Sequence, residues 1–475
     1  MRRPWPELAL LGVAAAFALT FAGGSIWLDE AFSVQVAESP WARFWELLRN
    51  DNGPPLYYAL LKGWIEVFGD GERALRALSA LMAVAAVVPA IGLGREVGGG
   101  SRASGLAAGL LFACSAQVAL HARAARMYAL VLLLAAMATW LWSRWLGGRG
   151  TKLTLSAFAL TTALGAYTHY WFAFLTLAQL AGAGAILRRK ALPLLVAALA
   201  GWAPFLAWAP TLSAQLQNGS RSWIPPVTPW APFEALAGVL GRPSTFALTA
   251  LIAVLAWRQR PRPEPAWNAA AILVATALLV PFALSLGHPI FWPVRHAAIA
   301  VPAVAALLGA PLAQLLQPRA LALVLASLLA LRGVTHAAEA QAAESREKTG
   351  SDRAAAAYLA AHAAPGDAVI FVGLSGPALR YYLRRAPIEP RAFPTEMDQH
   401  PAWIDPASLS PSSLEQEAAA LDQSLHARPV WLVSVEGDPI ADHLRARLVT
   451  RPRDASARLD GLFYDRIERF LATPP

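Results

Sequence analysis

The sequence predicts an α-helical protein that crosses a membrane many times and ends in a small soluble α/β domain. Hydrophobic residues make up 56% of the 475 residues and charged residues only 15%. That balance leaves too little polar surface for a soluble protein of this size. Long apolar stretches recur through residues 1–335. After about residue 336 the composition becomes more polar, and short apolar strands replace the long apolar runs.

A membrane-spanning helix needs about 20 mostly apolar residues, and about eleven such stretches are recognisable here. We interpret the first stretch as a retained helix rather than a cleaved signal, because no convincing cleavage site follows it before Asp29. The expected spans are 7–24, 76–94, 103–120, 127–146, 153–170, 172–187, 191–210, 238–256, 267–286, 296–316 and 319–335.

The net charge is +9, and basic residues between the apolar runs fall in short clusters in alternate loops of this arrangement. The clusters are Arg2 and Arg3, Arg95 and Arg102, Arg149 and Lys152, Arg188 to Lys190, and Arg258 to Arg262. Positively charged loops stay in the cytoplasm, so we expect the amino terminus there. The loops with Asp29, Arg126, His169 and Arg295 then share the extracytoplasmic face with the tail. Because the basic residues lie in separate loops and do not form one patterned face, the sequence also argues against a nucleic-acid partner.

The chain is therefore expected to contain a polytopic membrane domain over residues 1–335, with a long first extracytoplasmic loop over 25–76. A cap domain should follow over residues 336–475. Apolar residues at 368–372 and 429–435 predict two buried strands in this cap. Neither is followed by a glycine-rich phosphate-binding motif, so no nucleotide site is expected there.

Two adjacent carboxylates, Asp29 and Glu30, come a few residues after the outer end of the first span. One interpretation is a water-solvated pair at the membrane surface. Ionisable groups close to hydrocarbon are nevertheless expensive and usually functional. We predict that Asp29 is a general base acting on an acceptor hydroxyl, and that Glu30 orients Asp29 or the acceptor.

Arginines on the outer face run against the usual distribution of basic residues and suggest an anionic partner. Arg123 and Arg126 lie in one short connection, and Arg295 lies near the start of a later span. Arginine binds phosphate through two parallel hydrogen bonds and stays charged at any relevant pH. We predict that these three side chains bind a phosphate. The alternative for Arg123 and Arg126 is that they reach out to lipid headgroups.

Aromatic and imidazole side chains cluster at the outer ends of the predicted helices. An aromatic belt at the membrane surface explains the tryptophans and tyrosines, but it explains the histidines less well. Aromatic faces beside polar groups are also what a sugar ring packs against. The candidate sugar- or acceptor-binding residues are Tyr57, Tyr58, Tyr128, His169, Trp171 and His296. His121, His169 and His296 lack the spacing of metal ligands, so we expect neither a metal nor a cofactor.

Several motifs together resemble those of membrane enzymes of the glycosyltransferase family 39 type. This group includes protein O-mannosyltransferases and the bacterial aminoarabinose transferases of lipid A. The segments that carry the resemblance are Trp27 to Ser33, Asp51 to Tyr58, Gly63-Trp64, Phe68-Gly69, Arg73, Ala125 to Leu130, Tyr167 to Tyr170, and Arg295-His296 before an apolar helix with Pro302.

The resemblance implies a GT-C fold, an active site on the outer face and a polyprenyl-phosphate sugar as donor. It further implies that Asp29 is the base and that Arg126 holds the donor phosphate. The sequence departs from the family pattern at Gly53, where relatives usually carry histidine, and at Arg123-Ala124, where they usually carry Gln-Glu. A second acidic group of the family pattern is therefore missing.

The expected activity is inverting transfer of a sugar to an extracytoplasmic lipid, glycan or protein. Two alternatives stay open: a transporter or flippase for a lipid-linked glycan, and a catalytically degenerate scaffold. The high content of alanine, arginine and proline is typical of a GC-rich bacterial genome. The bacterial inner membrane, with its lipids as neighbours, is accordingly the expected location.

Overall fold

The computed structural model describes residues 5–19, 24–217, 224–240, 265–350, 352–373, 376–395, 397, 409–435, 437–459 and 466–472. The chain divides into two compact units. The helical unit comprises Met1–Ala22, Asn52–Gln217 and Arg221–Ala337. The α/β unit comprises Gly23–Asp51, Asn218–Ser220 and Ala338–Pro475.

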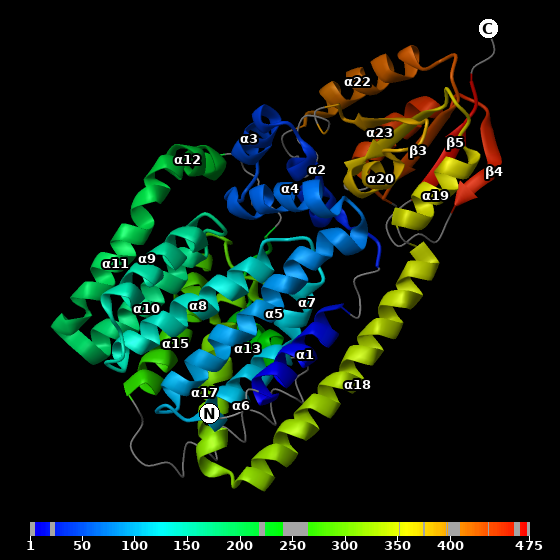
Figure 1. Cartoon of the computed structure of the whole chain (residues 1–475). Coiled ribbons are helices and arrows are strands. Elements are labelled where there is room, and N and C mark those ends of the chain that lie inside the picture. The colour runs from blue at the N-terminus through cyan, green and yellow to red at the C-terminus, as the bar shows by residue number, and fades with distance from the viewer. Residues whose placement is uncertain are drawn as a thin grey trace. The chain divides into compact units, whose positions relative to one another are not determined.

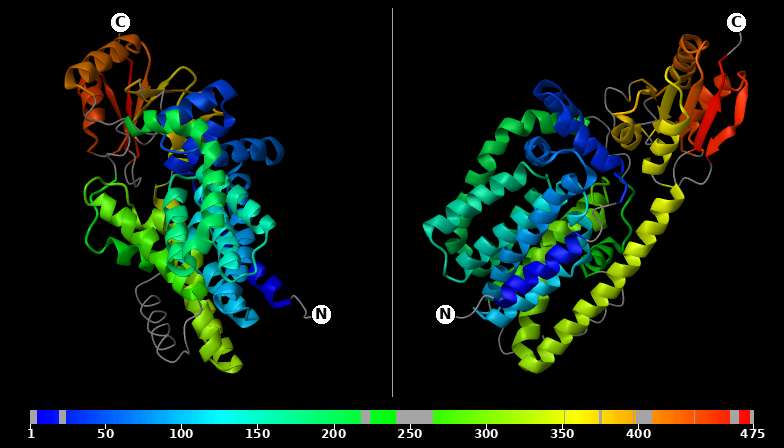
Figure 2. Two further views of the ribbon diagram at one scale, coloured as in Figure 1. Left: turned by 90° about the vertical axis from the view of Figure 1, so that its left-hand side faces the viewer. Right: turned by 45° about the vertical axis from the view of Figure 1, so that its right-hand side comes forward.

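The helical unit is a bundle whose long apolar helices pack along their lengths (Figures 1 and 2). Its α-helices are α1 (Trp5–Leu19), α4 (Leu56–Phe68), α5 (Glu72–Val97), α6 (Arg102–Ala113), α7 (Ala116–Ala122), α8 (Tyr128–Leu146), α9 (Lys152–Ala166), α10 (Phe172–Leu187), α11 (Leu192–Trp202), α12 (Ala209–Gln217), α13 (Ala231–Leu240), α15 (Pro265–Ser285), α16 (Pro293–His296), α17 (Val301–Leu315) and the first part of α18 (Pro318–Gly350). Short 3₁₀ turns continue several of these helices: η1 (Arg188–Ala191), η2 (Ala203–Trp208) and η3 (Ala297–Ala300).

The prediction of a polytopic helical membrane protein is confirmed. Within the described residues, 6 helical segments are long and apolar enough to cross a membrane, or up to 7 if α6 and α7, bent by 56°, form one span. The 46-residue run Phe172–Gln217 contains two of the expected spans, and α1 and α9 are shorter apolar helices. The expected span at 238–256 lies mostly outside the described residues. Every other predicted span coincides with an apolar helical segment.

Helices α5, α6 and α17 approach one another closely where their contacting residues are small. A Cβ atom added to Gly309 of α17 would lie 2.5 Å from the backbone nitrogen of Ala108 in α6. A Cβ atom on Gly94 of α5 would lie 2.4 Å from the Cβ of Ala108. In hydrocarbon, where lipid tails are as apolar as leucine, such close backbone contact is a main source of helix association.

Ion pairs gather the basic loops at one end of the bundle. Glu7 of α1 pairs with Arg95 and Arg102, at 2.6 Å in each case. Glu96, at the end of α5, pairs with Arg149 and lies 3.5 Å from Arg144. These arginines lie in or next to the α5–α6 and α8–α9 connections, which the sequence assigns to one side of the membrane. That this side is cytoplasmic stays a prediction.

The α/β unit is built on a five-stranded sheet with the order β2-β1-β3-β5-β4. Its strands are β1 (Ala368–Val372), β2 (Glu389–Phe393), β3 (Val430–Ser434), β4 (Arg453–Leu459) and β5 (Arg466–Phe470). Strand β1 pairs in parallel with β2 and β3, whereas β5 pairs antiparallel with β3 and β4. Both strands predicted from the sequence, β1 and β3, are present at the centre of this sheet.

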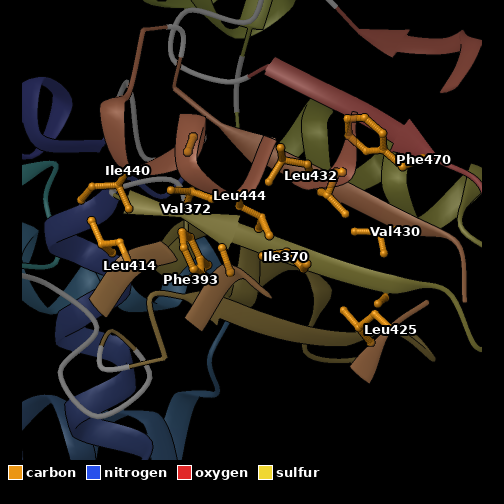
Figure 3. Packing of buried hydrophobic residues seen from close by; sticks show 14 residues of the cluster. Ile370, Val372, Phe393, Leu414, Leu425, Val430, Leu432, Ile440, Leu444 and Phe470 are labelled. Atoms are coloured by element: carbon orange, nitrogen blue, oxygen red, sulfur yellow. The ribbon is translucent and has the colours of Figure 1, made fainter. Parts of the chain in front are cut away.

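Helices cover both faces of the sheet, so the unit has three layers (Figure 1). One face packs against α22 (Pro411–Ser424) and α23 (Pro439–Leu448), with Ile370, Leu432 and Leu444 in the shared core (Figure 3). The other face packs against α19 (Asp352–His362) and α20 (Gly376–Leu383). Because side chains alternate along each strand, the apolar runs of β1 and β3 fill both cores.

Two helices of the first loop, α2 (Leu28–Glu38) and α3 (Trp41–Asn50), fold with the α/β unit. The backbone N–H of Ile26 donates to the hydroxyl of Tyr382 at 2.6 Å, and the hydroxyl of Ser25 lies 3.2 Å from the same oxygen. The N–H of Arg353 in turn donates to the hydroxyl of Ser25 at 3.3 Å. The sequence-based division at residue 336 assigns α2 and α3 to the membrane domain, whereas here they fold with the α/β unit.

Gly309→Ala should lower the stability of the helical unit by about 1–3 kcal/mol, because the added methyl group would collide with the backbone of α6. Gly184→Ala is the matched control, since nothing lies within 4 Å of the Cβ position at this helical glycine. It should leave stability unchanged or slightly higher, as alanine favours helix. Thermal unfolding in detergent measures both. Equal melting temperatures for the two variants would contradict the close packing of α6 and α17.

Candidate functional site

Rings from four segments of the helical unit lie in contact, one after the other. We call this set the ring ladder: His121, Tyr128, His169, His296 and Trp171. The centroids are 4.7 Å apart for His121 and Tyr128, 5.4 Å for Tyr128 and His169, and 5.9 Å for His169 and His296. Trp171 stacks on His296 at 4.0 Å. Four of the side chains predicted to bind sugar or acceptor, all but Tyr57 and Tyr58, are thus brought together.

Hydrogen bonds fix the tautomers of the ladder histidines. Nδ1 of His169 accepts the backbone N–H of Trp171 at 3.1 Å, and Nδ1 of His296 accepts that of Trp292 at 2.9 Å. Nε2 of His121 lies 2.8 Å from the amide oxygen of Gln117. A ring nitrogen that accepts a hydrogen bond carries no proton, so His169 and His296 carry theirs on Nε2. Each therefore offers one N–H donor.

His169 and His296 lie outside the helices that are long enough to span a membrane. Burial lowers the pKa of His169 well below its usual range, and the charge of Arg126 lowers it further. Burial also lowers the pKa of His296, with smaller contributions from His169 and Arg295. Protonation would also turn each Nδ1 from an acceptor into a donor facing a backbone N–H. Both rings are neutral at pH 7 and cannot serve as cationic phosphate ligands.

Arg126 contacts Tyr58 of α4 directly and Tyr57 of the same helix through Ser79. Its Nη1 lies 3.5 Å from the hydroxyl of Tyr58. The hydroxyl of Tyr57 lies 2.9 Å from that of Ser79, which donates to the backbone carbonyl of Arg126 at 3.4 Å. Tyr57 and Tyr58 are almost completely buried. Both tyrosines thus support the Arg126 segment, whereas their contact with a sugar stays a prediction.

Arg123 and Arg295 have local contacts of their own. Nε of Arg123 donates to the carbonyl of Ala119 at 2.8 Å, which satisfies an acceptor in the last turn of α7. The guanidinium of Arg295 lies 5.2 Å from the centroid of Trp292. Both arginines are half-buried. The contacts of Arg126 reach two other helices, α4 and α5.

The two carboxylates, Asp29 and Glu30, belong to the α/β unit, in the first turn of α2. Their exposed fractions are only 5% for Asp29 and 1% for Glu30. Oε2 of Glu30 lies 3.5 Å from the backbone nitrogen of Trp27, in the position of a helix-capping acceptor. The carboxylate of Glu30 thus has a structural contact at the start of the helix. Which of the two carboxylates acts as a base stays a prediction.

Three contacting residues were missed at the sequence level: Gln117, Ser79 and Tyr382. Gln117 precedes His121 by one helical turn, so its position was a usable signal. Ser79 and Tyr382 contact residues that are distant in the chain. A single sequence contains no pattern that would predict such contacts. Within the described part of the chain, no three His, Cys, Asp or Glu side chains gather as metal ligands would.

Comparison with solved structures identifies the fold. ArnT from Cupriavidus metallidurans bound to undecaprenyl phosphate matches with a TM-score of 0.67 over 100% of both chains, at 14% identity. The apo state of that protein matches with a TM-score of 0.64 over 98% of both chains, also at 14% identity. The oligosaccharyltransferase AglB from Archaeoglobus fulgidus, in complex with an inhibitory peptide and a dolichol-phosphate, matches at 0.50 and 14% identity, over 94% of this chain and 72% of that one.

No protein-family model matches the sequence, and no curated protein sequence matches it either. The similarity to the solved structures covers the helices and the soluble domain alike. The chain therefore has the GT-C fold of membrane glycosyltransferases, as the sequence motifs predicted.

Acidification should destabilise the helical unit through its neutral histidines. Below the pKa of an unfolded histidine, about 6.5, the unfolded chain binds protons that folded His169 and His296 do not. Stability is therefore full above that pH and falls by up to about 2 kcal/mol per histidine between pH 7.5 and pH 5. His169→Asn keeps an acceptor for the N–H of Trp171 but cannot titrate. We expect the melting temperature of this variant to fall less between pH 7.5 and pH 5 than that of wild type. An equal fall would show that His169 is protonated in the folded protein.

Proposed function

We propose that this protein is a membrane glycosyltransferase that transfers a sugar from a polyprenyl-phosphate donor to an acceptor hydroxyl, with inversion at the anomeric carbon. The observation that carries the proposal is Arg126, held by Tyr57, Tyr58 and Ser79 beside the ring ladder of a GT-C fold. A fixed guanidinium suits a phosphate, and neutral rings suit a sugar. The undecaprenyl phosphate in the ArnT structure and the dolichol-phosphate in the AglB structure support this choice of donor class.

The reaction is a displacement at the anomeric carbon of the donor sugar. The acceptor oxygen attacks this carbon from the side opposite the phosphate, and Asp29 takes the proton of the acceptor hydroxyl. The bond between the anomeric carbon and the phosphate oxygen breaks, and its electron pair leaves with the polyprenyl phosphate. Arg126 stabilises the negative charge that develops on the leaving group, with Arg295 and the Nη groups of Arg123 as additional ligands.

The ring ladder would bind the sugar of the donor. Stacked aromatic faces offer apolar surface to a sugar ring, and the Nε2–H groups of His169 and His296 offer donors to its hydroxyls. Because both imidazoles are neutral, they leave the charge of the donor to the arginines. This separation supports a site that recognises phosphate and sugar through different side chains.

The acceptor is proposed to be a lipid, glycan or protein on the extracytoplasmic face of a bacterial inner membrane. The ion pairs that collect Arg95, Arg102 and Arg149 at one end of the bundle support this orientation, since that end would be cytoplasmic. A transporter for a lipid-linked glycan is the second candidate. It predicts binding of the same lipid without any cleavage.

Asp29→Asn should lower the rate of sugar transfer by roughly two to four orders of magnitude, because the amide keeps the shape of the carboxylate but cannot accept a proton. Affinity for the donor should stay close to that of wild type. The assay incubates purified protein with labelled polyprenyl-phosphate sugars and measures release of the lipid phosphate.

Glu30→Gln is the matched control, since glutamine can still accept the N–H of Trp27 and close the first turn of α2. It should retain most of the activity. Loss of activity in Glu30→Gln with normal activity in Asp29→Asn would assign the base to Glu30. Normal activity in both variants would rule out the proposed base, and binding without release of lipid phosphate by wild type would favour transport.

Arg126→Lys should weaken donor binding and lower turnover together, because lysine keeps the charge but loses the planar pair of donors. Arg189→Lys is the control: Arg189 is exposed, in the basic cluster assigned to the cytoplasmic side. It should behave as wild type in both measurements. If Arg126→Lys also binds and turns over donor normally, Arg126 serves only the surrounding lipid.

A further inference from the structure

Three consecutive cations, Arg188, Arg189 and Lys190, form the turn η1 between α10 and α11. We call them the basic turn, and all three are exposed. A 3₁₀ helix has three residues per turn, so their side chains point in directions about 120° apart. They therefore surround the end of this helix pair and present their charges to whatever lies around it.

The basic turn lacks the acidic partners that other basic residues of the helical unit have. Glu7 pairs with Arg95, and Glu96 pairs with Arg149. By contrast, the sequence contains no aspartate or glutamate between residues 97 and 233. Within the described part of the chain, no cation of the basic turn has an ion pair with a carboxylate. Its positive charge is therefore open to an anion from outside this part of the chain.

The backbone of Arg188 suggests that its side chain has a function. Its φ is 51° and its ψ is −123°. Glycine adopts such a conformation readily, whereas residues with a side chain adopt it rarely. Among the described residues, Arg188 is the one residue other than glycine that has a positive φ. Backbone strain of this kind gathers at binding sites, so an arginine where glycine would fit better favours a role for the guanidinium group.

Helix α11 presents an apolar stripe that begins two residues after the basic turn. Leu192, Leu195, Val196 and Leu199 follow one another at the spacing of helical turns, so they share one face. Their exposed fractions are 60%, 39%, 58% and 62%. The buried residues of α11, such as Leu194, lie on the opposite face. Because α11 lies at one side of the bundle (Figure 1), this stripe faces lipid in a membrane.

The stripe and the basic turn match the two parts of a phospholipid. From Leu192 to Leu199 the stripe is about 10 Å long, whereas the hydrocarbon of one leaflet is roughly 15 Å thick. Arginine and lysine at the end of a lipid-facing helix reach the headgroup level. A free anion would contact the cations alone, and a water-soluble acidic protein would not cover apolar residues inside hydrocarbon. A phospholipid with a negative headgroup contacts both features.

We propose that this surface binds an anionic phospholipid, with the phosphate on the basic turn and one acyl chain along the stripe of α11. The 16 residues of α10, about 24 Å of helix, separate the basic turn from Trp171 of the ring ladder. The lipid site is therefore distinct from the proposed donor site. It goes beyond the proposed sugar transfer and does not depend on it, because binding of the lipid requires no catalysis.

The test measures binding of phosphatidylglycerol to the full-length protein in a neutral detergent, with phosphatidylcholine of the same acyl chains as control. We expect phosphatidylglycerol to bind at least about tenfold more tightly, with an affinity that falls as salt is added. Equal affinity for the two lipids would overturn the proposal. If inorganic phosphate displaces phosphatidylglycerol at an equal concentration, the basic turn is a simple anion site and the assignment to a phospholipid is wrong.

Variants with one charge removed assign the binding to the basic turn. Arg189→Gln should lower the affinity for phosphatidylglycerol about fivefold, and adding Lys190→Gln should bring the loss to about tenfold or more. Arg319→Gln is the matched control, since Arg319 is also an exposed arginine at a helix connection, before α18. Its affinity should change by less than about twofold. An equal loss in Arg189→Gln and Arg319→Gln would show that binding follows total charge, and unchanged affinity in the double variant would place the lipid elsewhere.

Arg188→Gly separates lipid binding from folding. Glycine relieves the strain of a positive φ, so the melting temperature of this variant in phosphatidylcholine micelles should be no lower than that of wild type. Its affinity for phosphatidylglycerol should nevertheless fall about fivefold, because one cation is lost. A loss of affinity without a loss of stability cannot come from misfolding. An Arg188→Gly protein that binds phosphatidylglycerol as tightly as wild type would overturn the role assigned to this side chain.

Discussion

Close packing of α5, α6 and α17 at small residues is the constraint on which the helical unit depends. Lipid surrounds such a bundle with material as apolar as its own side chains, so contact between backbones replaces the hydrophobic effect as the main attraction. These helices also fix the functional segments. Helix α6 leads into α7 with His121, α17 follows His296, and α5 carries Ser79 beside Arg126. The positions of His121 and His296 in the ladder therefore depend on how closely the glycines let these helices approach.

The sequence predicted the helices well because membrane insertion depends on local apolar length. The stretches at 76–94 and 127–146 became α5 and α8 with modest changes at their ends. The strands at 368–372 and 430–434 were recognisable because an apolar run of that length is typical of a buried parallel strand. The fold of α2 and α3 with the distant α/β unit was not predictable, since it depends on contacts such as that of Ile26 with Tyr382.

The predicted site residues that the structure brings close together are those that violate a local rule, although their roles stay predictions. Arg126 has a charge where the membrane pattern disfavours one, and His169 and His296 interrupt an otherwise ordinary aromatic belt. The states of these histidines were not predictable, because they depend on which backbone N–H each Nδ1 accepts. Likewise, only the structure shows that the carboxylate of Glu30 lies in the position of a helix-capping acceptor at the first turn of α2.

The hydrogen bond from Ile26 to Tyr382 joins residues that are 356 positions apart in the chain. A ribosome adds roughly 5–20 residues each second, so roughly 20 to 70 seconds separate the synthesis of the two partners. During that interval the segment with both carboxylates has left the ribosome, but the strands and helices that complete its fold do not yet exist. The carboxylates therefore reach their final environment only after Tyr382 has been synthesised, and a nascent chain that stops before this residue cannot assemble this part of the molecule.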